Sequence, residues 1–226
     1  MLGFRIISTQ QRHQILKSWY SLITASEGDL AVLITLENGK PLKESLSEVR
    51  YGASFIEWFA EEARRVYGDV IPNPVPDQRL LVLKQPVGVV AIITPWNFPF
   101  AVRRVVNLLL LVYGSGPRIG CCLGHAGPNP TVAFGVFFWR ALAAGCTTIV
   151  KPASETPLSA LALAELGMRA GVPQGVLNVV TTSHKHTKEV GEELTKHADI
   201  RKVSFTGSVR ANFLDCDIQG SSCAKT

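Results

Sequence analysis

The chain has 226 residues, of which 46% are hydrophobic and 18% are charged, a balance typical of a globular protein with a sizeable core. The net charge is only +5, and the basic residues are interspersed with acidic ones, which argues against a nucleic-acid-binding stripe. The five cysteines are odd in number and lack metal-ligand spacing, so neither a disulfide framework nor a zinc site is indicated. The longest apolar run falls short of the roughly 18 residues of a bilayer-spanning helix. We therefore expect a soluble protein in a reducing compartment, the cytoplasm or alternatively the mitochondrion.

The N-terminal part of the chain has the apolar periodicity of helices. Apolar residues recur at three- and four-residue spacings within residues 11–25, and further helices are predicted over residues 29–39 and 42–66. We expect these helices to be scaffold, with aromatic residues such as Trp58 and Phe59 in the core, because this spacing is what helix packing produces.

Strands and helices alternate in the rest of the chain. Residues 69–77 are rich in proline and predict a loop. The expected strands cover residues 79–85, 87–93, 146–150, 176–180 and 202–205, and the helices between the later strands cover residues 157–170 and 187–197. This succession predicts an α/β fold, a Rossmann-like parallel sheet with flanking helices and right-handed crossovers.

The most informative stretch is Thr94-Pro95-Trp96-Asn97-Phe98-Pro99, which follows the apolar strand at 87–93. Residues just beyond such a strand line the ligand crevice of an open α/β sheet. Two prolines stiffen the loop. The amide of Asn97 can then donate to a developing oxyanion, and Trp96 can form the wall of a cofactor pocket. The same six residues equally fit an ordinary proline-rich turn.

This stretch resembles the PWNFP signature of the aldehyde dehydrogenases. Two later segments are similar to that family in the same order: residues 151–157 resemble its cofactor-ribose segment, and residues 203–208 resemble the start of its phosphate turn. Four other stretches are most similar to the succinate-semialdehyde dehydrogenases within the family, and they cover residues 36–41, 55–59, 66–69 and 158–166. The resemblance implies a partial NAD(P)-binding domain over residues 1–208, followed by a divergent tail at 209–226, with no catalytic domain.

The resemblance implies a dinucleotide site built from three loops. The residues of the first two loops are Thr94, Pro95, Trp96, Asn97, Lys151, Pro152, Ala153 and Ser154. In the third loop, Gly207 and Ser208 would hold the pyrophosphate at a helix N-terminus. A carboxylate at the position of Ser154 would repel a 2′-phosphate, so Ser154 favours NADP over NAD as the cofactor. The neighbouring Glu155 weakens this preference, because a one-residue shift of the loop would present it instead.

The family activity is oxidation of an aldehyde, here succinate semialdehyde in 4-aminobutyrate catabolism, to a carboxylate with NAD(P). That chemistry needs a nucleophilic thiolate, hydride transfer and a carboxylate base, and Asn97 would supply half of the oxyanion hole. No segment matches the family's base or its nucleophile. Cys146 matches a non-catalytic position and is expected to be a buried small hydrophobe, and the residues around Cys223 are in the wrong order. We therefore expect the 226-residue chain to be inactive by itself.

Residues 102–140 interrupt the resemblance. They are longer than the family's connection, and unstructured connections beyond about 15 residues are unusual in compact domains. We interpret them as an insert, such as translated sequence of a retained intron. Glycines at positions 114, 116 and 120 are spaced one residue too far for the dinucleotide fingerprint.

Other departures lie near the C-terminal end of the resemblance. The helix that should follow Ser208 is missing from the sequence pattern. Thr182 replaces a glycine usual in the family and would crowd the cofactor. His184 and His186 lack a carboxylate cluster, so we expect surface residues and no metal site.

Three hypotheses remain: an aldehyde dehydrogenase fragment, a non-catalytic module that binds nucleotide or joins other subunits, and a chain that does not fold stably. The expected partners are an aldehyde substrate and a homo-oligomer, without nucleic acid or membrane. The first hypothesis requires the loops that carry Asn97, Lys151 and Gly207 to meet at neighbouring strand ends.

Overall fold

The computed structural model describes residues 7–72, 74–75, 78–97, 99, 119–122 and 134–205, with the backbone alone at 119–122 and 134–137. The helices in these ranges are α1 (Thr9–Ala25), α2 (Glu27–Asn38), α3 (Leu42–Glu62), α4 (Phe134–Ala144), α5 (Pro157–Arg169) and α6 (Thr187–Lys196), with a short 3-10 helix at His184–His186. The strands are β1 (Asp69–Ile71), β2 (Leu80–Val82), β3 (Val89–Ile93), β4 (Ile119–Cys122), β5 (Thr147–Lys151), β6 (Leu177–Val179) and β7 (Ile200–Phe205). Their ends differ from the predicted ones by a few residues, the usual scatter of element boundaries.

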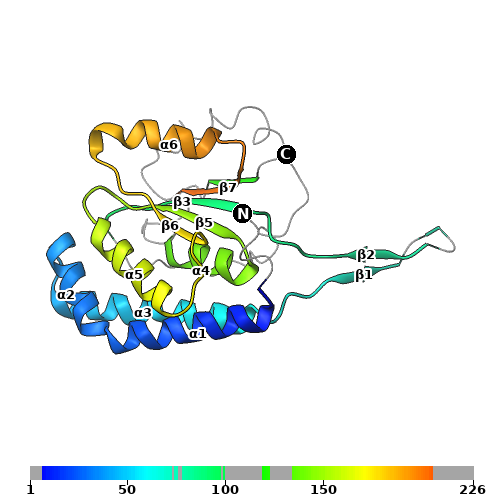
Figure 1. Cartoon of the computed structure of the whole chain (residues 1–226), viewed down its shortest axis with the longest axis horizontal. Helices are drawn as coiled ribbons and strands as arrows, with labels where there is room; N and C mark the ends of the chain where they lie inside the picture. The colour runs from blue at the N-terminus through cyan, green and yellow to red at the C-terminus, as the bar shows by residue number, and fades with distance from the viewer. Residues whose placement is uncertain are drawn as a thin grey trace.

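The described strands other than β1 and β2 form one sheet in the order β4-β7-β3-β5-β6, and every neighbouring pair is parallel. Helices α1 to α5 cover one face of this sheet and α6 covers the other (Figure 1). A parallel sheet buried on both faces needs apolar residues on both sides of its strands, as in β3, where Val89 to Ile92 are all buried. The predicted α/β, Rossmann-like class is confirmed.

Local sequence sets the ends of the N-terminal helices. α1 begins with a capping box, in which the Gln11 amide donates to Ser8 Oγ over 3.2 Å and the Ser8 amide donates to Gln11 Oε1 over 3.0 Å. α2 ends where Gly39 adopts a left-handed conformation with φ of 76°, which glycine tolerates at little cost. The chain therefore reverses direction directly after Asn38.

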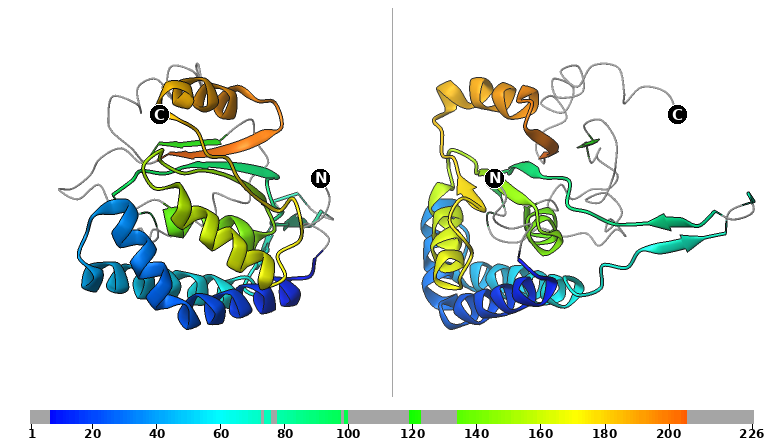
Figure 2. Two further views of the ribbon diagram at one scale, coloured as in Figure 1. Left: turned by 60° about the vertical axis from the view of Figure 1, so that its left-hand side comes forward. Right: turned by 45° about the vertical axis from the view of Figure 1, so that its right-hand side comes forward.

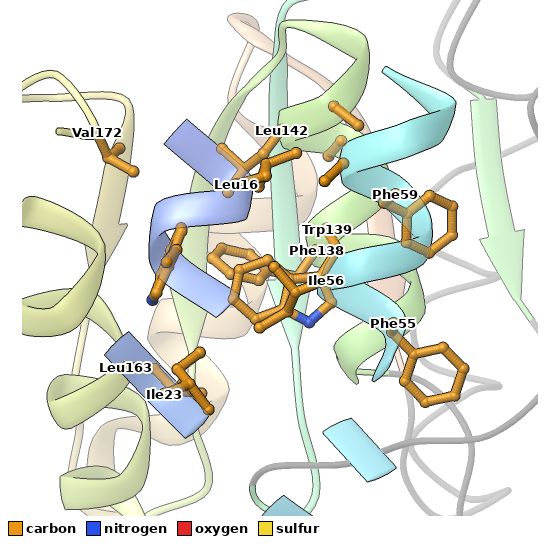
Figure 3. Close-up of a cluster of buried hydrophobic side chains, with 14 of the residues drawn as sticks. Leu16, Ile23, Phe55, Ile56, Phe59, Phe138, Trp139, Leu142, Leu163 and Val172 are labelled. Atoms are coloured by element: carbon orange, nitrogen blue, oxygen red, sulfur yellow. The ribbon is translucent and has the colours of Figure 1, made fainter. Parts of the chain in front are cut away.

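The main core lies between the N-terminal helices and the sheet. Trp19 of α1 meets Phe138 and Trp139 of α4 edge to face, with ring centroids 5.8 and 4.6 Å apart. Figure 3 shows Phe138 and Trp139 beside Ile56 of α3. A Cβ on Gly167 of α5 would lie 2.5 Å from the Trp19 ring, so this helix approaches too closely for any larger residue. Helices α4 and α5 are thereby packed closely against α1.

The end of the predicted insert is part of this core. The prediction that residues 102–140 are foreign to the fold is wrong for the last residues of that range, because Phe138 and Trp139 are each only 1% exposed. The predicted boundary cuts through α4, whose aromatic residues fill the space between α1 and α3. β4 also lies within the predicted insert and pairs with β7. The remainder of 102–140 lies outside the described residues, and for it the insert stays a prediction.

Two further expectations are corrected. Phe59 is buried, but Trp58 is 62% exposed; Trp58 lies about 100° around α3 from Phe59, on the side of the helix that faces solvent. The predicted loop at 69–77 begins with a strand, because β1 pairs antiparallel with β2, with Val70 opposite Leu81. The two strands form an arm that projects away from the sheet (Figure 2).

Candidate functional site

Three strand ends meet at the carboxyl edge of the sheet. Ile93, the last residue of β3, is paired with Lys151 at the end of β5 and with Phe205 at the end of β7. The backbone contact continues one residue further, where the amide of Thr94 donates to the carbonyl of Lys151 over 3.1 Å. The loops that carry Thr94 and Lys151 therefore start side by side, as the first hypothesis requires for these two loops. Gly207 and Ser208 follow Phe205 and lie outside the described residues.

The loop after β3 is held by its backbone. Its first residue, Thr94, is buried, whereas Trp96 is 55% exposed. The carbonyl of Trp96 accepts a hydrogen bond of 2.6 Å from Asn38 Nδ2, and the carbonyl of Asn97 accepts one of 3.0 Å from Lys40 Nζ. Asn38 is the last residue of α2 and Lys40 lies two residues beyond it, so the direction of this loop is set by residues far away in the sequence.

The side chain of Asn97 carries an unsatisfied polar atom. Its Oδ1 is buried and has no hydrogen-bond partner among the residues that the structure describes. Buried polar atoms are nearly always hydrogen-bonded, so an exception at the mouth of a parallel sheet indicates a place for a ligand atom. Rotation of the amide exchanges Oδ1 with the two donors of Nδ2, and a donor at this position is what an oxyanion would need.

Lys151 is a cation with little solvent around it. The residue is only 3% exposed, and burial lowers the pKa of its ammonium group, while the nearby Glu155 carboxylate opposes that change. Within the described residues, Nζ donates one hydrogen bond, to the carbonyl of Pro152 over 3.2 Å. An ammonium group has three donors. Two therefore remain for hydroxyl or phosphate oxygens.

The loop after β5 leads into α5 through a short turn. Ala153 and Ser154 are half-buried, and the Thr156 amide donates to the Ala153 carbonyl over 3.3 Å. Glu155 is exposed and lies 3.1 Å from Nε2 of His184. This contact joins the loops that follow β5 and β6.

Glu37 is a site-forming residue to which sequence analysis assigned no role. Its Oε2 accepts hydrogen bonds from the Ser159 amide (2.9 Å) and hydroxyl (2.5 Å), and its Oε1 accepts from the Leu158 amide (2.5 Å). Leu158 is 121 positions away along the chain, so no local pattern could reveal the contact. The Glu37 carboxylate interacts favourably with the positive end of the α5 dipole. It therefore occupies the helix N-terminus at which a phosphate could otherwise bind.

The remaining candidate residues are structural or surface residues. Cys146 is fully buried directly before β5, at the opposite edge of the sheet from Lys151, and burial raises the pKa of its thiol. The expectation of a buried cysteine is confirmed. His184 and His186 are exposed, and no three potential metal ligands cluster in the described part of the chain. None of the helices described is long and apolar enough to cross a membrane.

Comparison with known proteins supports the same family. Residues 2–114 and 129–212 match the pattern described as the aldehyde dehydrogenase family. The human mitochondrial succinate-semialdehyde dehydrogenase is 48% identical over 206 residues, which are 91% of this chain and 32% of the human protein. A glutarate-semialdehyde dehydrogenase from Pseudomonas putida is 49% identical over 91% of this chain and 36% of its own length. The chain thus spans about a third of the length of these relatives.

A solved structure agrees with this match. The crystal structure of an Escherichia coli NADP-dependent enzyme has 45% sequence identity and a TM-score of 0.76, over 96% of this chain and 38% of that chain. The unmatched stretch between the two family segments, residues 115–128, is shorter than the predicted insert and lies inside it.

Proposed function

This chain belongs to the aldehyde dehydrogenase family, and from that premise we propose that it binds NADP as the cofactor-binding part of an enzyme that oxidises succinate semialdehyde. The observation that carries the proposal is the pairing of Ile93 with both Lys151 and Phe205. It brings the starts of all three family loops to one edge of the sheet.

The described residues suit a dinucleotide. The unsatisfied Oδ1 of Asn97 and the two remaining donors of Lys151 are polar groups that a ligand could satisfy. Lys151 and Ser154 would hold the ribose and its 2′-phosphate, Trp96 would line the pocket, and Gly207 and Ser208 would take the pyrophosphate. The bound nicotinamide would supply the hydride acceptor for aldehyde oxidation. Asn97 would orient the carbonyl oxygen of the aldehyde through its amide.

The preference for NADP over NAD rests on the loop after β5. Ser154 is neutral, and the competing carboxylate of Glu155 lies against His184 at 3.1 Å. A serine can donate to a 2′-phosphate, whereas a free carboxylate would repel it. The name of the Escherichia coli structure, which specifies NADP, supports the same choice.

The substrate proposal rests on the relatives. One is named for succinate semialdehyde and another for glutarate semialdehyde, so the shared substrate class is a short aldehyde with a distal carboxylate. We propose the four-carbon compound, and a reducing cytoplasm that suits the free thiol of Cys146. Kinetics with both semialdehydes and fractionation of source cells would test these two points.

Thermal unfolding of the purified 226-residue chain tests nucleotide binding. NADP at about 100 times its dissociation constant should raise the free energy of unfolding by about 2.7 kcal/mol, and NAD should do so only at higher concentration. An unchanged melting temperature with NADP would contradict the proposal. In the same preparation we expect no turnover of succinate semialdehyde, because no cysteine matched the nucleophile; a rate of about 1 per second or more would contradict that expectation.

A second proposed function is contact with other subunits through the arm of β1 and β2. The arm exposes large apolar side chains, including Val70 (75%), Leu81 (61%) and Leu83 (76%). Paired strands with free edges and apolar faces favour association. We therefore expect the chain to form a homo-oligomer, and Leu81→Lys to shift its sedimentation towards the monomer. Identical sedimentation of variant and parent would exclude the arm as the contact.

A further inference from the structure

We propose that residues 37–40, Glu-Asn-Gly-Lys, form a clamp that fixes the first two loops of the nucleotide site relative to each other. Glu37, Asn38 and Lys40 are then positioning residues for nucleotide binding. This inference rests on the proposed function, because the loops matter only if a dinucleotide binds between them. The clamp itself can be measured without any nucleotide.

The reversal at Gly39 lets three neighbouring side chains reach two different loops. The Gly39 amide closes α2 by donating to the Thr35 carbonyl over 2.9 Å, and its φ is 76°. Asn38 and Lys40 lie on either side of this turn and contact the loop after β3. Glu37, one residue earlier in the helix, contacts α5. A β-carbon on Gly39 would meet nothing within 4 Å, so the backbone conformation, and not space, requires glycine here.

The hydrogen bonds described between the clamp and the first loop are made to backbone carbonyls. Asn38 donates to the carbonyl of Trp96, and Lys40 donates to the carbonyl of Asn97. Lys40 is itself fixed by Glu48, whose side chain is 2% exposed and lies 2.5 Å from Lys40 Nζ. A buried ion pair of this kind holds one geometry, because either partner alone would be a costly buried charge.

The contacts to the second loop reach its far end. β5 holds the start of this loop at Lys151, and the first turn of α5 holds its end. Glu37 accepts the amide hydrogens of Leu158 and Ser159, two of the four donors that a helix N-terminus leaves unsatisfied. Since Pro157 has no amide hydrogen, Glu37 accepts most of the amide hydrogens that the first turn of α5 offers.

The clamp connects the two loops beyond the carboxyl edge of the sheet. Among the described residues, the hydrogen bond from Thr94 to Lys151 is the last one between the backbones of the two loops. Beyond it, residues 37–40 connect the loops through α2, which the core fixes against the sheet. Loops that are ordered before a ligand arrives lose less conformational entropy on binding. Removal of the clamp should therefore weaken binding without removing any group that touches the nucleotide.

The test uses the full 226-residue chain with two probes, NADP and 2′,5′-ADP, which lacks the nicotinamide half. Asn38→Ala removes one hydrogen bond from the first loop, and we expect the dissociation constant of NADP to rise about 5- to 10-fold with little change for 2′,5′-ADP. Glu37→Gln loosens the second loop and should weaken both probes. Lys17→Met is the matched control, because it breaks the exposed Lys17–Glu61 pair of 3.1 Å in the same helical layer and should change neither.

Two readouts separate positioning from general destabilisation. Glu37→Gln should speed hydrogen exchange at the amides of Leu158 and Ser159, with exchange in β3 unchanged. Asn38→Ala should shift the fluorescence emission of Trp96, isolated by comparison with the same variants carrying Trp96→Phe. If NADP binds the parent chain and both variants equally well, or if exchange and emission match the control, the clamp is wrong. If the parent chain binds no NADP, the proposed function fails, and exchange and emission alone still decide the clamp.

Discussion

The two ends of β5 contain two buried, titratable side chains in different surroundings. Lys151 at the carboxyl end and Cys146 just before the amino end are 3% and 0% exposed. Lys151 lies beside Thr94 and the loops of the site, whereas Cys146 lies in the core between the helices and the sheet. Burial alone therefore does not indicate a functional residue. In a parallel sheet, the end of the strand at which a buried residue lies determines whether it can face a ligand, because only the carboxyl ends of the strands face the crevice.

The largest expected effect is on NADP affinity, and it follows from removal of the Lys151 ammonium group. Lys151→Met should raise the dissociation constant of NADP about 30-fold, or about 2 kcal/mol, the scale of a charge-assisted hydrogen bond. Cys146→Ala, at the other end of the strand, is the control and should leave this constant unchanged. Isothermal titration calorimetry measures both. Equal affinities of the Lys151 variant and the parent for NADP would contradict a role of Lys151 in nucleotide binding.

A carboxylate introduced at position 154 tests the carboxyl end of β5 in a second way. Ser154→Glu places a negative charge beside the proposed 2′-phosphate and should weaken NADP about tenfold, or about 1.4 kcal/mol. Binding of NAD, which has no 2′-phosphate, should stay level or improve. The ratio of the two dissociation constants is the measurement, since general damage to the fold would change both alike. An unaltered ratio would show that Ser154 is not near the 2′ position.

At the amino end the expected effect is on stability. Cys146→Ser replaces a buried thiol by a hydroxyl in an apolar site, which should lower the free energy of unfolding by at least about 1 kcal/mol. Urea denaturation of the variant and the parent would measure this difference. Affinity for NADP should not change. A stability loss together with weaker binding would mean that the two ends of the strand are coupled.

The smallest expected effects are opposite slopes of stability with pH. Burial lowers the pKa of Lys151, so the unfolded chain binds more protons just below the ordinary lysine value near 10.4, and stability should rise with pH there. Burial raises the pKa of Cys146, so the folded chain keeps its proton above the ordinary thiol value near 8.5, and stability should fall. Comparing Lys151→Met and Cys146→Ala with the parent between about pH 8 and 10 isolates the two slopes. Slopes of the same sign would contradict the assignment.

Most elements of the fold follow from local sequence. The apolar run at Val89–Ile93 predicts a buried strand whatever its neighbours are, and the spacing in α1 predicts a helix, since both signals depend on residues a few positions apart. The first two loops of the site are predictable for the same reason, because each directly follows such a strand. Trp58, β1 and α4 were mispredicted, because partners far along the chain decide their environments.

The sequence by itself determined that the chain is α/β, that Asn97 follows a strand and that Lys151 stands at the end of another, because these are properties of short segments and of motifs shared with the family. Only the tertiary structure decided that β3 lies between β5 and β7, that Phe138 and Trp139 pack on Trp19, and that Glu37 caps a helix 121 residues away. Strand order and long-range hydrogen bonds depend on how the whole core packs. No local pattern of residues encodes them.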